Sequence, residues 1–496
     1  MSSPTTSAAT PSTTFTGTPR LDELAGHAVT VMGLGLFGGG AAVARFLVRR
    51  GARVTVTDLR SASELAPALA ELDGLPIRFV LGEHREEDFT HSALVIANPA
   101  VAPSNPLLQA ARARGVPISS EIALFLELCP ARIAAITGTQ GKSSTCHTLW
   151  QLLVAAGLPA HLGGNIGRSL VEEAERMQST DLVVLEISSY QLETLPQTLR
   201  GPDGPPRVEA VCVVNVLADH LERHGSIEAY AAAKQRILEL ALAAQGTAVL
   251  SAEDPRLASW RPDGLARLDV YPTRFSERGL NFADGAFRRD RRVLGRLADL
   301  PLSGAFQREN TLMALGLAQL LGAAPDALAR SLPGLRALPH RLEDLGVFEG
   351  HRVWDNGVST TPDSTISALL SLAPGCTLLV GGKAKNLALE ELVLTLQGRV
   401  RRVVVFGAAL EAFSARFRSA GIETHGAAGL ADAVALAFER MQPGEELLFS
   451  PACASFDAYL NFKERALAFR RALPLPSPRT TAPSSGGTPF PPREPA

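Results

Sequence analysis

The chain has 496 residues, of which 46% are apolar and 20% charged, and its formal net charge at pH 7 is −2. A chain of this length exceeds what one hydrophobic core fills, so we expect about two to four domains. The small net charge argues against a protein that works mainly on nucleic acid or on an anionic membrane. The five cysteines include no CxxC pair, which argues against a disulfide framework or a zinc site and favours the cytoplasm.

The two ends of the chain differ from the rest in composition. Residues 1–20 are rich in Ser, Thr, Pro and Ala and lack the basic and apolar regions of a signal peptide, and residues 473–496 are rich in Pro and Ser. We predict that both are disordered tails. Between them, short apolar runs alternate with amphipathic stretches, which predicts an α/β fold of parallel sheets covered by helices. These runs form three blocks, at residues 21–118, 119–337 and 338–472.

The first block carries GLGLFG at residues 33–38, between a predicted strand and a predicted helix. Asp58 ends the next predicted strand, about 20 residues further on, as in the Rossmann-type pattern. In that pattern backbone N–H groups at a helix N-terminus face a phosphate. The pattern alone suits a dinucleotide, a nucleotide-sugar diphosphate or a tight turn without a ligand.

The second block opens with a stronger phosphate-binding pattern. The sequence AAITGTQGKSST runs from a predicted strand through Gly138 and Gly141 into a predicted helix. The loop is shorter than a standard P-loop, because Ile136 stands where the first glycine would be. The chemistry is retained, since glycine lets the backbone wrap phosphates, Lys142 neutralises them and the Ser143 hydroxyl can bind Mg²⁺.

Further polar groups of this block are expected near the same phosphates. Glu186 ends the predicted strand DLVVLEIS, and Asp219 and His220 follow another predicted strand. Ligands bind at this end of parallel sheets, and a carboxylate beside a triphosphate is a natural Mg²⁺ ligand. Asn165 lies in LGGNIG, which we predict to be a glycine-rich turn whose amide can orient a phosphate or carboxylate oxygen.

Lysine is rare in this chain, which has 5 lysines and 43 arginines. One of them, Lys234, lies in the middle of SIEAYAAAKQRILEL, which we predict to be a single helix over residues 226–240. Where this protein needs a positive charge it almost always has arginine. The composition therefore raises the question of why residue 234 is a lysine.

The third block begins with LPHRLE at residues 338–343, from which Arg341 can reach a nucleotide across a domain cleft. Lys385 follows the predicted strand CTLLVGG, and Ser455 lies at a strand-to-helix turn further along the chain. Cys453, beside that turn, has no evident activating partner, so we interpret it as structural.

The sequence resembles the Mur ligase family, the ATP-dependent amide-forming enzymes of peptidoglycan precursor synthesis, over about residues 20–470. It carries, in the family's order, GTQGKS, GGNIG, EISSYQLE, VNVLADHLERHGS, YAAAKQRI, LPHRLE and SPACASFDAYLNFKER. EISSYQLE, LPHRLE and SPACAS most resemble the branch that adds D-glutamate to UDP-N-acetylmuramoyl-L-alanine. The resemblance implies a UDP-binding domain, an ATP-binding domain with a P-loop and a C-terminal Rossmann-like domain. We expect a monomer that acts on small-molecule substrates.

The resemblance also implies roles for individual residues. The UDP-sugar pocket would be lined by Gly35, Leu36, Phe37, Asp58 and Arg60. ATP would be bound by Gly138, Thr139, Gln140, Gly141, Lys142, Ser143, Ser144, Gln307, Asn310 and Arg341. The catalytic residues would be Lys142, Asn165, Glu186, His220 and Lys234, and the glutamate-binding residues would be Lys385, Ser455 and Phe462.

In this family the lysine that matches Lys234 is carbamylated by CO₂, a reaction that requires a primary amine and that arginine cannot undergo. Carbamylation turns a cation into a carboxylate-like anion, so Ser143 and Glu186 would bind one Mg²⁺ and His220 and carbamylated Lys234 another. The resemblance therefore explains why residue 234 is a lysine.

The chain departs from the family pattern at several positions. Gln307 stands where an asparagine is usual, Asn356-Gly357 stands where Asp-Ser is common, and Ala466 replaces a glycine. The loss of the carboxylate at residue 356 puts a ribose contact in doubt, for which Asp355 is a candidate replacement. The alternatives left open are a ligase for another amino acid, such as L-glutamate or a folate-type substrate, an NAD-binding protein, and a non-catalytic relative that binds nucleotide.

Overall fold

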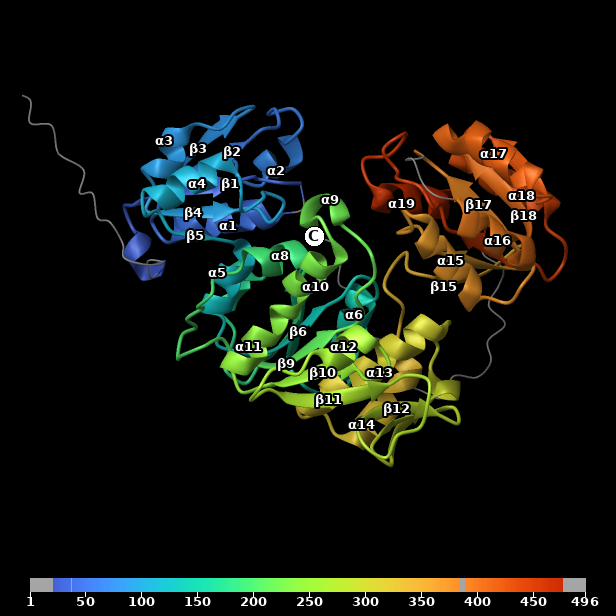
Figure 1. The fold of residues 1–496 in the computed structure, drawn as a ribbon. Coiled ribbons are helices and arrows are strands. Elements are labelled where there is room, and N and C mark those ends of the chain that lie inside the picture. Colours follow the sequence, from blue (N-terminus) through green and yellow to red (C-terminus); the bar gives the residue numbers. More distant parts are fainter. Residues whose placement is uncertain (1–20, 37, 384–388, 476–496) are drawn as a thin grey trace, which may run out of the picture. The chain divides into compact units, whose positions relative to one another are not determined.

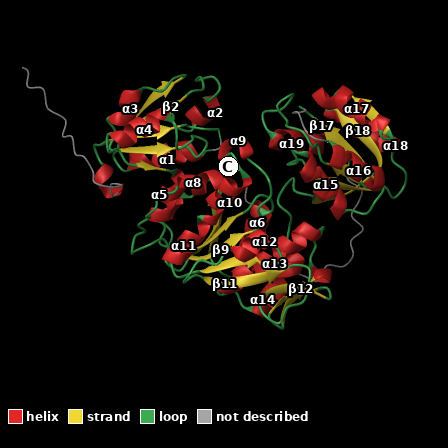
Figure 2. Cartoon of the chain, in the orientation of Figure 1, coloured by secondary structure: helices red, strands yellow, loops and turns green. Residues whose placement is uncertain are grey.

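The computed structural model describes residues 21–36, 38–383 and 389–475. In that part of the chain the strands form three sheets covered by helices, an α/β fold in three domains (Figures 1 and 2). The chain divides into two compact units, one of residues 1–301 with 307–336 and one of residues 302–306 with 337–496. The first two sheets belong to the first unit and the third sheet to the second.

The first sheet has five parallel strands in the order β3-β2-β1-β4-β5. Its strands are β1 (Ala28–Met32), β2 (Arg53–Asp58), β3 (Ile77–Leu81), β4 (Leu94–Ala97) and β5 (Ile118–Ser119). The helices of this part are α1 (Gly39–Arg49), α2 (Ala66–Ala70), α3 (Glu86–Thr90), α4 (Pro106–Ala113) and α5 (Glu121–Leu128). GLGLFG connects the end of β1 to the start of α1, as its sequence predicts.

The second sheet has nine strands in the order β14-β13-β12-β11-β10-β9-β6-β8-β7. The strands are β6 (Arg132–Thr137), β7 (Ala160–Gly164), β8 (Leu182–Glu186), β9 (Val208–Val213), β10 (Thr247–Ser251), β11 (Ala266–Tyr271), β12 (Leu280–Ala283), β13 (Ala286–Arg289) and β14 (Arg292–Arg296). Strands β12 to β14 are an antiparallel extension of an otherwise parallel sheet.

Nine α-helices and two 3₁₀ turns, one of them at Leu297–Asp299, accompany the second sheet in the described part of the chain. The others are α6 (Lys142–Ala155), α7 (Val171–Ala174), α8 (Ser189–Thr194), α9 (Leu221–His224), α10 (Ile227–Gln235), α11 (Ile237–Ala243), α12 (Pro255–Ser259), α13 (Ala305–Leu320), α14 (Pro325–Ser331) and the 3₁₀ turn Leu332–Gly334. The predicted single helix over residues 226–240 is in fact two helices, because α10 ends at Gln235 and α11 begins at Ile237. The predicted turn LGGNIG begins as the edge strand β7, and only its second half is a turn.

The third sheet has six strands in the order β15-β16-β20-β17-β18-β19. They are β15 (Glu343–Phe348), β16 (His351–Asp355), β17 (Cys376–Gly381), β18 (Val400–Phe406), β19 (Thr424–Ala427) and β20 (Leu447–Phe449). The helices are α15 (Pro362–Ser371), α16 (Glu390–Arg399), α17 (Leu410–Ser419), α18 (Leu430–Arg440) and α19 (Phe462–Ala472). Only β15 runs antiparallel to its neighbour.

The two sheets of the first unit are joined by a shared apolar core and by ion pairs. The core runs from Leu24 in the first part to Trp260 in the second. On its surface, Arg45 and Arg49 of α1 pair with Glu172 of α7 at 2.8 and 2.5 Å. Burial raises the pKa of Glu172, but the hydrogen bonds and charges of these arginines outweigh it and hold that pKa below its ordinary value.

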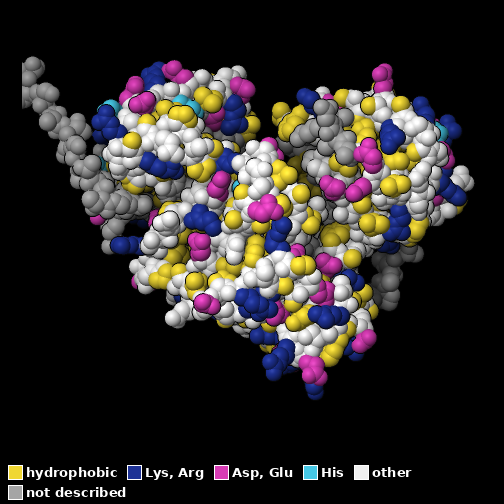
Figure 3. Space-filling model, in the orientation of Figure 1, with side chains coloured by type: hydrophobic (Ala, Val, Ile, Leu, Met, Phe, Trp, Pro, Cys, Tyr) yellow, Lys and Arg dark blue, Asp and Glu magenta, His cyan; other side chains and the backbone are white. Residues whose placement is uncertain are grey.

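Charged side chains of both signs are interspersed over the face of the molecule in Figure 3, in agreement with the small net charge. Among the described residues no helix combines the length and the apolar composition needed to cross a membrane.

Candidate functional site

The phosphate-binding loop lies between β6 and α6, where the sequence predicts it. Gly141 directly precedes the helix with a left-handed φ of 81°, and a Cβ there would meet Asn310 Oδ1 at 2.5 Å.

 This left-handed backbone conformation favours glycine. The loop therefore requires glycine here both for its conformation and for the close approach of α13.

Two of the five lysines converge on this loop. Lys142 Nζ donates to the carbonyl oxygens of Gly138 and Thr139 at 3.0 and 2.9 Å. Lys234 Nζ, from α10, donates to the same Gly138 oxygen at 2.7 Å. Two ammonium groups thus share one acceptor, which places a concentrated positive charge at the start of α6, where a helix N-terminus already favours anions.

Lys234 is a buried lysine with an unusual environment. Its side chain is 1% exposed, and its Nζ lies 4.4 Å from the centre of the Tyr230 ring. Burial, together with the charge of Lys142, lowers the pKa of Lys234 from 10.5 to about 7, against the opposite effect of Asp219 and Glu186. A large fraction of this amine is therefore neutral near neutral pH, and a neutral amine is a nucleophile.

Glu186 ends β8 beside the loop, as the sequence predicts, and is 1% exposed. Its Oε1 accepts a hydrogen bond from Asn165 Nδ2 at 2.8 Å, and its backbone oxygen accepts one from Asn165 N at 2.9 Å. Its Oε2 is buried and has no hydrogen-bond partner among the described residues. Since a buried carboxylate oxygen without a partner is costly, this atom is suited to bind a cation.

His220 lies in a cluster of aromatic and imidazole rings next to Lys234. The backbone of His220 is left-handed, with a φ of 52°. The residue directly precedes α9, and its ring is exposed. The Tyr190 hydroxyl lies 3.3 Å from His220 Nδ1, and the Tyr230 ring is 6.2 Å from the His220 ring between centres. His220 and Lys234 thus both lie near the Tyr230 ring.

Gln307 and Asn310, two of the predicted ATP-binding residues, lie on α13 and are both 2% exposed. Asn310 Oδ1 accepts from Thr145 Oγ1 at 3.2 Å, so this residue contacts the helix that follows the phosphate loop. The side-chain atoms Gln307 Oε1 and Asn310 Nδ2 are buried without a hydrogen-bond partner in the described residues.

Sequence reasoning missed Asn215 and Tyr230. The Asn215 side chain accepts hydrogen bonds from the backbone N–H groups of Thr139 and Gln140 at 3.1 and 2.9 Å, and Tyr230 Oη donates to Thr139 Oγ1 at 3.2 Å. Asn215 had a signal, because it lies two residues after the buried strand β9, but Tyr230 is an ordinary apolar helix position in the sequence.

The predicted UDP-sugar residues gather at the carboxyl ends of β1 and β2. Asp58 accepts hydrogen bonds from Arg60 Nε and Nη2 at 3.1 and 3.0 Å, and Gly35 N lies 3.4 Å from its Oδ2. Burial alone would raise the pKa of Asp58, but the bonds from Arg60 and Gly35 hold it below its ordinary value. Leu36 is half-exposed beside them, and Phe37 lies outside the described residues.

In the second unit, the segments with predicted glutamate residues meet. Lys383 N donates to Ala454 O at 2.9 Å, which joins the segment after β17 to the loop that carries Ser455. Ser455 is 2% exposed and Phe462 begins α19. Lys385 lies outside the described residues. Burial raises the pKa of Cys453 to about 12, in agreement with a structural thiol.

Asp355 is not available to replace the missing carboxylate at residue 356. It is fully buried, and its Oδ2 accepts from His340 Nδ1 at 2.7 Å and from Arg470 Nε at 2.8 Å, while its Oδ1 accepts from Gly357 N at 2.9 Å. Asn356 is also engaged, because its amide nitrogen donates to Ser450 Oγ at 3.0 Å. Arg341, the predicted nucleotide contact, lies close by in the chain, in the loop before β15.

Two of the departures from the family pattern are coupled by packing. A Cβ added at Gly357 would lie 2.6 Å from the Ala466 Cβ, a distance that carbon atoms in contact do not reach. The methyl group at residue 466 thus occupies the space that a larger residue at 357 would need. Glycine at residue 357 therefore fits against alanine at residue 466, and the two departures from the family pattern are linked by this contact.

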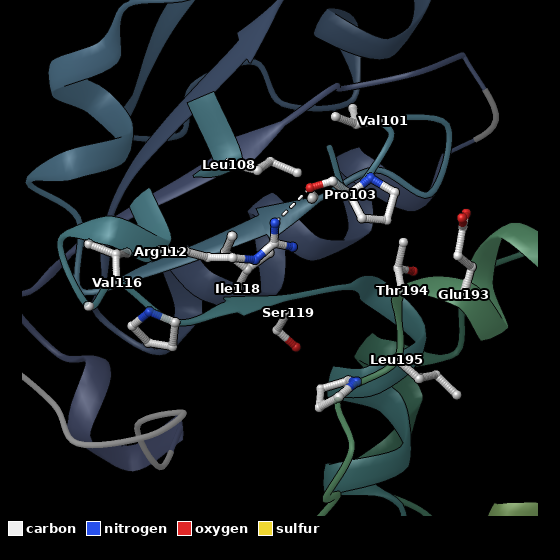
Figure 4. A pocket seen from close by; sticks show the side chains of 14 residues that line it. Val101, Pro103, Leu108, Arg112, Val116, Ile118, Ser119, Glu193, Thr194 and Leu195 are labelled. Atoms are coloured by element: carbon white, nitrogen blue, oxygen red, sulfur yellow. Dashed lines mark hydrogen bonds between the residues drawn. The ribbon is translucent and has the colours of Figure 1, made fainter. Parts of the chain in front are cut away.

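A cavity of about 440 Å³ lies away from these residues, in the first unit (Figure 4). It is lined by α4, β5 and the end of α8, and includes Val101, Arg112, Ser119 and Glu193. None of its lining residues is a predicted site residue.

Two parts of the chain match models of known protein families. Residues 136–318 match the Mur ligase middle domain, and residues 27–120 match the Mur ligase MurD-like N-terminal domain. The chain is 36% identical over 466 residues to a UDP-N-acetylmuramoylalanine--D-glutamate ligase of Roseiflexus sp. (strain RS-1), covering 90% of this chain and 98% of the relative. It is 37% identical over 460 residues to the enzyme of that name of Geobacter metallireducens, covering 91% and 98%.

Solved structures show the same fold. The UDP-N-acetylmuramate-alanine ligase of Thermotoga maritima superposes with a TM-score of 0.57 at 19% identity, covering 90% of this chain and 98% of that one. The MurF ligase of the same organism, in complex with ADP, gives 0.55 at 17% identity, covering 92% and 97%. The sequence relatives and the matched domains together establish that the chain belongs to the Mur ligase family.

Proposed function

We propose that the protein is an ATP-dependent ligase that joins D-glutamate to UDP-N-acetylmuramoyl-L-alanine in the cytoplasm. The names of its relatives support this substrate pair. The observation that carries the proposal is the convergence of Lys142, Lys234 and Glu186 on one phosphate-binding loop. The Lys142 ammonium suits a bound triphosphate, and the unpartnered oxygen of the buried Glu186 carboxylate, with a reactive amine at Lys234, suits its metal ions.

ATP would bind along the loop from Gly138 to Ser144. On binding, Lys142 Nζ would exchange its bonds to the loop carbonyls for the β- and γ-phosphates, which charge favours. Gln307 and Asn310 of α13 would face the nucleotide with buried amide atoms that have no hydrogen-bond partner among the described residues. Arg341 enters this proposal as a nucleotide contact from the sequence alone.

The residues at the loop fit Mg²⁺. Glu186 offers the unpartnered Oε2, the Ser143 hydroxyl is buried at the start of α6, and hard oxygen donors are what Mg²⁺ prefers. When bound, Mg²⁺ would offset the charge of the phosphates during attack by an anion. Asn165 holds the other oxygen of Glu186, and so fixes the orientation of this carboxylate.

Lys234 would act as a carbamate. Its lowered pKa leaves the amine available to add to CO₂, which replaces the ammonium by an anion. The carbamate would serve with His220 as a second pair of metal ligands.

The chemistry then follows from these positions. A carboxylate oxygen of the alanyl group attacks the γ-phosphorus, the bond to the β-phosphate oxygen breaks, and ADP and an acyl phosphate form. The glutamate amine attacks the acyl carbon, loses a proton, and expels phosphate that retains the attacking oxygen. Lys142 and the loop N–H groups stabilise the transferring phosphoryl group through both steps.

Other residues than those at the phosphate loop would bind the uridine diphosphate of the acceptor and the glutamate. Asp58 and Arg60, with Gly35, Leu36 and Phe37, would hold the uridine diphosphate, and the low pKa of Asp58 keeps its carboxylate ionised. Lys385, Ser455 and Phe462 would hold glutamate. Phe37 and Lys385 enter this proposal from the sequence alone.

The test is amide formation by the purified protein with Mg²⁺, ATP and UDP-N-acetylmuramoyl-L-alanine, with D- or L-glutamate as the amine. We expect a ligated product, detected by mass spectrometry, and one ADP per product with D-glutamate only. Lys142→Ala is the control and should abolish both. A preference for L-glutamate would overturn the proposed substrate, and no product with either, from a folded protein that binds ATP, would overturn the proposed activity.

A further inference from the structure

The helix that follows His220 is too short to hold its own conformation. α9 spans only Leu221–His224, and a helix of one turn is unstable unless other parts of the protein fix it. His220 itself has a left-handed φ of 52° and an exposed side chain. A histidine that must stay within reach of a phosphate therefore needs support from outside its own segment.

Arg223, in α9, supplies contacts to this helix from two directions. Its side chain is only 11% exposed. Its Nε and Nη2 donate to Glu193 Oε2 of α8 at 3.0 and 2.8 Å. Its guanidinium carbon lies 4.9 Å from the centre of the Tyr190 ring, and the Tyr190 hydroxyl lies 3.3 Å from His220 Nδ1. Tyr190 thus stands between Arg223 and His220.

The other donors of Arg223 reach into the first part of the unit. Nη1 donates to Ala100 O at 3.1 Å, and Nη2 donates to Val101 O at 3.2 Å and lies 3.4 Å from Pro99 O. These carbonyls belong to the loop after β4. That loop begins at Asn98, whose side-chain nitrogen lies 3.4 Å from Gly33 O at the start of the glycine loop. Arg223 therefore connects Val101 with Glu193. Figure 4 shows these two residues at the border of the cavity, on different parts of the chain.

We propose that Arg223 is a positioning residue that fixes the distance between the glycine loop and His220. The guanidinium is suited to this role because its donors lie in a rigid plane and can engage one carboxylate and several carbonyls together. The inference rests on the proposed function, in which the glycine loop holds one end of the acceptor and His220 lies near the other. Arg223 then sets where the acceptor carboxylate stands relative to the γ-phosphate, without touching either.

The experiment compares kcat and KM of Arg223→Ala with those of the wild type. A misplacement of about 1 Å costs on the order of 100-fold in rate, so we expect kcat to fall by about 10- to 100-fold. KM for ATP should change by less than about twofold, because the hydrogen bonds and ring contact of Arg223 within the described residues reach other segments than the phosphate loop, so that uniform binding is unaffected. Arg223→Lys should recover little, since one ammonium cannot make the same set of bonds.

Two further variants make the result decisive. Tyr190→Phe removes only the hydroxyl that bonds His220 and should lower kcat with no loss of thermal stability, which covers the case in which Arg223→Ala folds poorly. Arg49→Gln removes another arginine between the same parts of the unit, at α1 and α7, and should leave kcat unchanged. A wild-type kcat in both Arg223→Ala and Tyr190→Phe, or an equal loss in Arg49→Gln, would overturn the inference. If the wild type and Arg49→Gln form no product, the proposed function fails instead.

Discussion

At the scale of single residues, the environment of Lys234 differs most clearly from that of an ordinary exposed lysine. Its amine is buried, shares an acceptor with Lys142 and has a pKa of about 7. Arginine at this position would stay charged and could not react with CO₂. Lysine is rare in this chain, and the environment of residue 234 suits a property that lysine has and arginine lacks. That property is an amine that can lose its charge and react with CO₂.

This environment leads to a prediction for Lys234→Arg. We expect the variant to keep ATP binding within a few-fold but to lose ligase activity by at least about 100-fold, the scale of losing a charge-stabilising group in an active site. The measurement is kcat beside the dissociation constant for ADP. Activity within a few-fold of the wild type would show that no carbamate is needed.

The same lysine predicts a pH and CO₂ dependence. With a pKa of about 7 the neutral amine rises from about a tenth at pH 6 to about nine tenths at pH 8, whereas an ordinary lysine would stay almost wholly charged. Activity of enzyme prepared free of CO₂ should therefore recover on addition of bicarbonate, and faster at pH 8 than at pH 6. Recovery that is equally fast at both values would contradict the lowered pKa.

At the scale of elements, strand ends bring the site together. β6, β8 and β9 of the second sheet each end in a loop that carries candidate site residues, since the carboxyl ends of parallel strands meet at one edge of a sheet, and β1 does the same in the first sheet. In the second unit the contact between the segment after β16 and α19 explains two unusual residues, because Gly357 lies against Ala466.

The packing of Gly357 against Ala466 is testable by a double-mutant cycle. Gly357→Ser should destabilise the protein by about 1–3 kcal/mol through overpacking, and Ala466→Gly should cost about 1 kcal/mol in a helix interior. The double variant should cost less than the sum of the two, because glycine at 466 makes room for the serine. Chemical denaturation of the four proteins measures this, and strict additivity would contradict the coupling.

Short sequence patterns correctly predicted the elements that depend mainly on residues close together in the chain. The strands and the phosphate loop follow from apolar runs and from glycine spacing, and both lie where the sequence predicts them. The break between α10 and α11 did not show in the sequence, because the residues around Arg236 all favour helix and the Arg236 side chain instead donates to Leu192 O and Leu195 O at the end of α8. The roles of Asn215, Tyr230 and Arg223 likewise depend on contacts with distant segments, which one sequence does not reveal.

At the scale of the whole molecule, the candidate site residues are divided between the two units. The first unit holds the glycine loop, the phosphate loop and the buried Lys234, and the second holds Arg341, Ser455 and Phe462. In the proposed function the first unit would bind the acceptor and the phosphates, whereas the candidate glutamate residues belong to the second. The residues proposed for the phosphoryl-transfer step, Lys142, Glu186 and Lys234, are all in the first.

The most direct measurement of the central claim follows an oxygen atom. The alanyl carboxylate of UDP-N-acetylmuramoyl-L-alanine is labelled with ¹⁸O, and the phosphate released with ATP, Mg²⁺ and D-glutamate is examined by mass spectrometry. Because the carboxylate oxygen attacks the γ-phosphorus and leaves with the phosphate, the account predicts one labelled oxygen in each phosphate and a ligated product in equal amount. Unlabelled phosphate, or labelled product without loss of one carboxylate oxygen, would contradict the acyl-phosphate mechanism and the role given to this site.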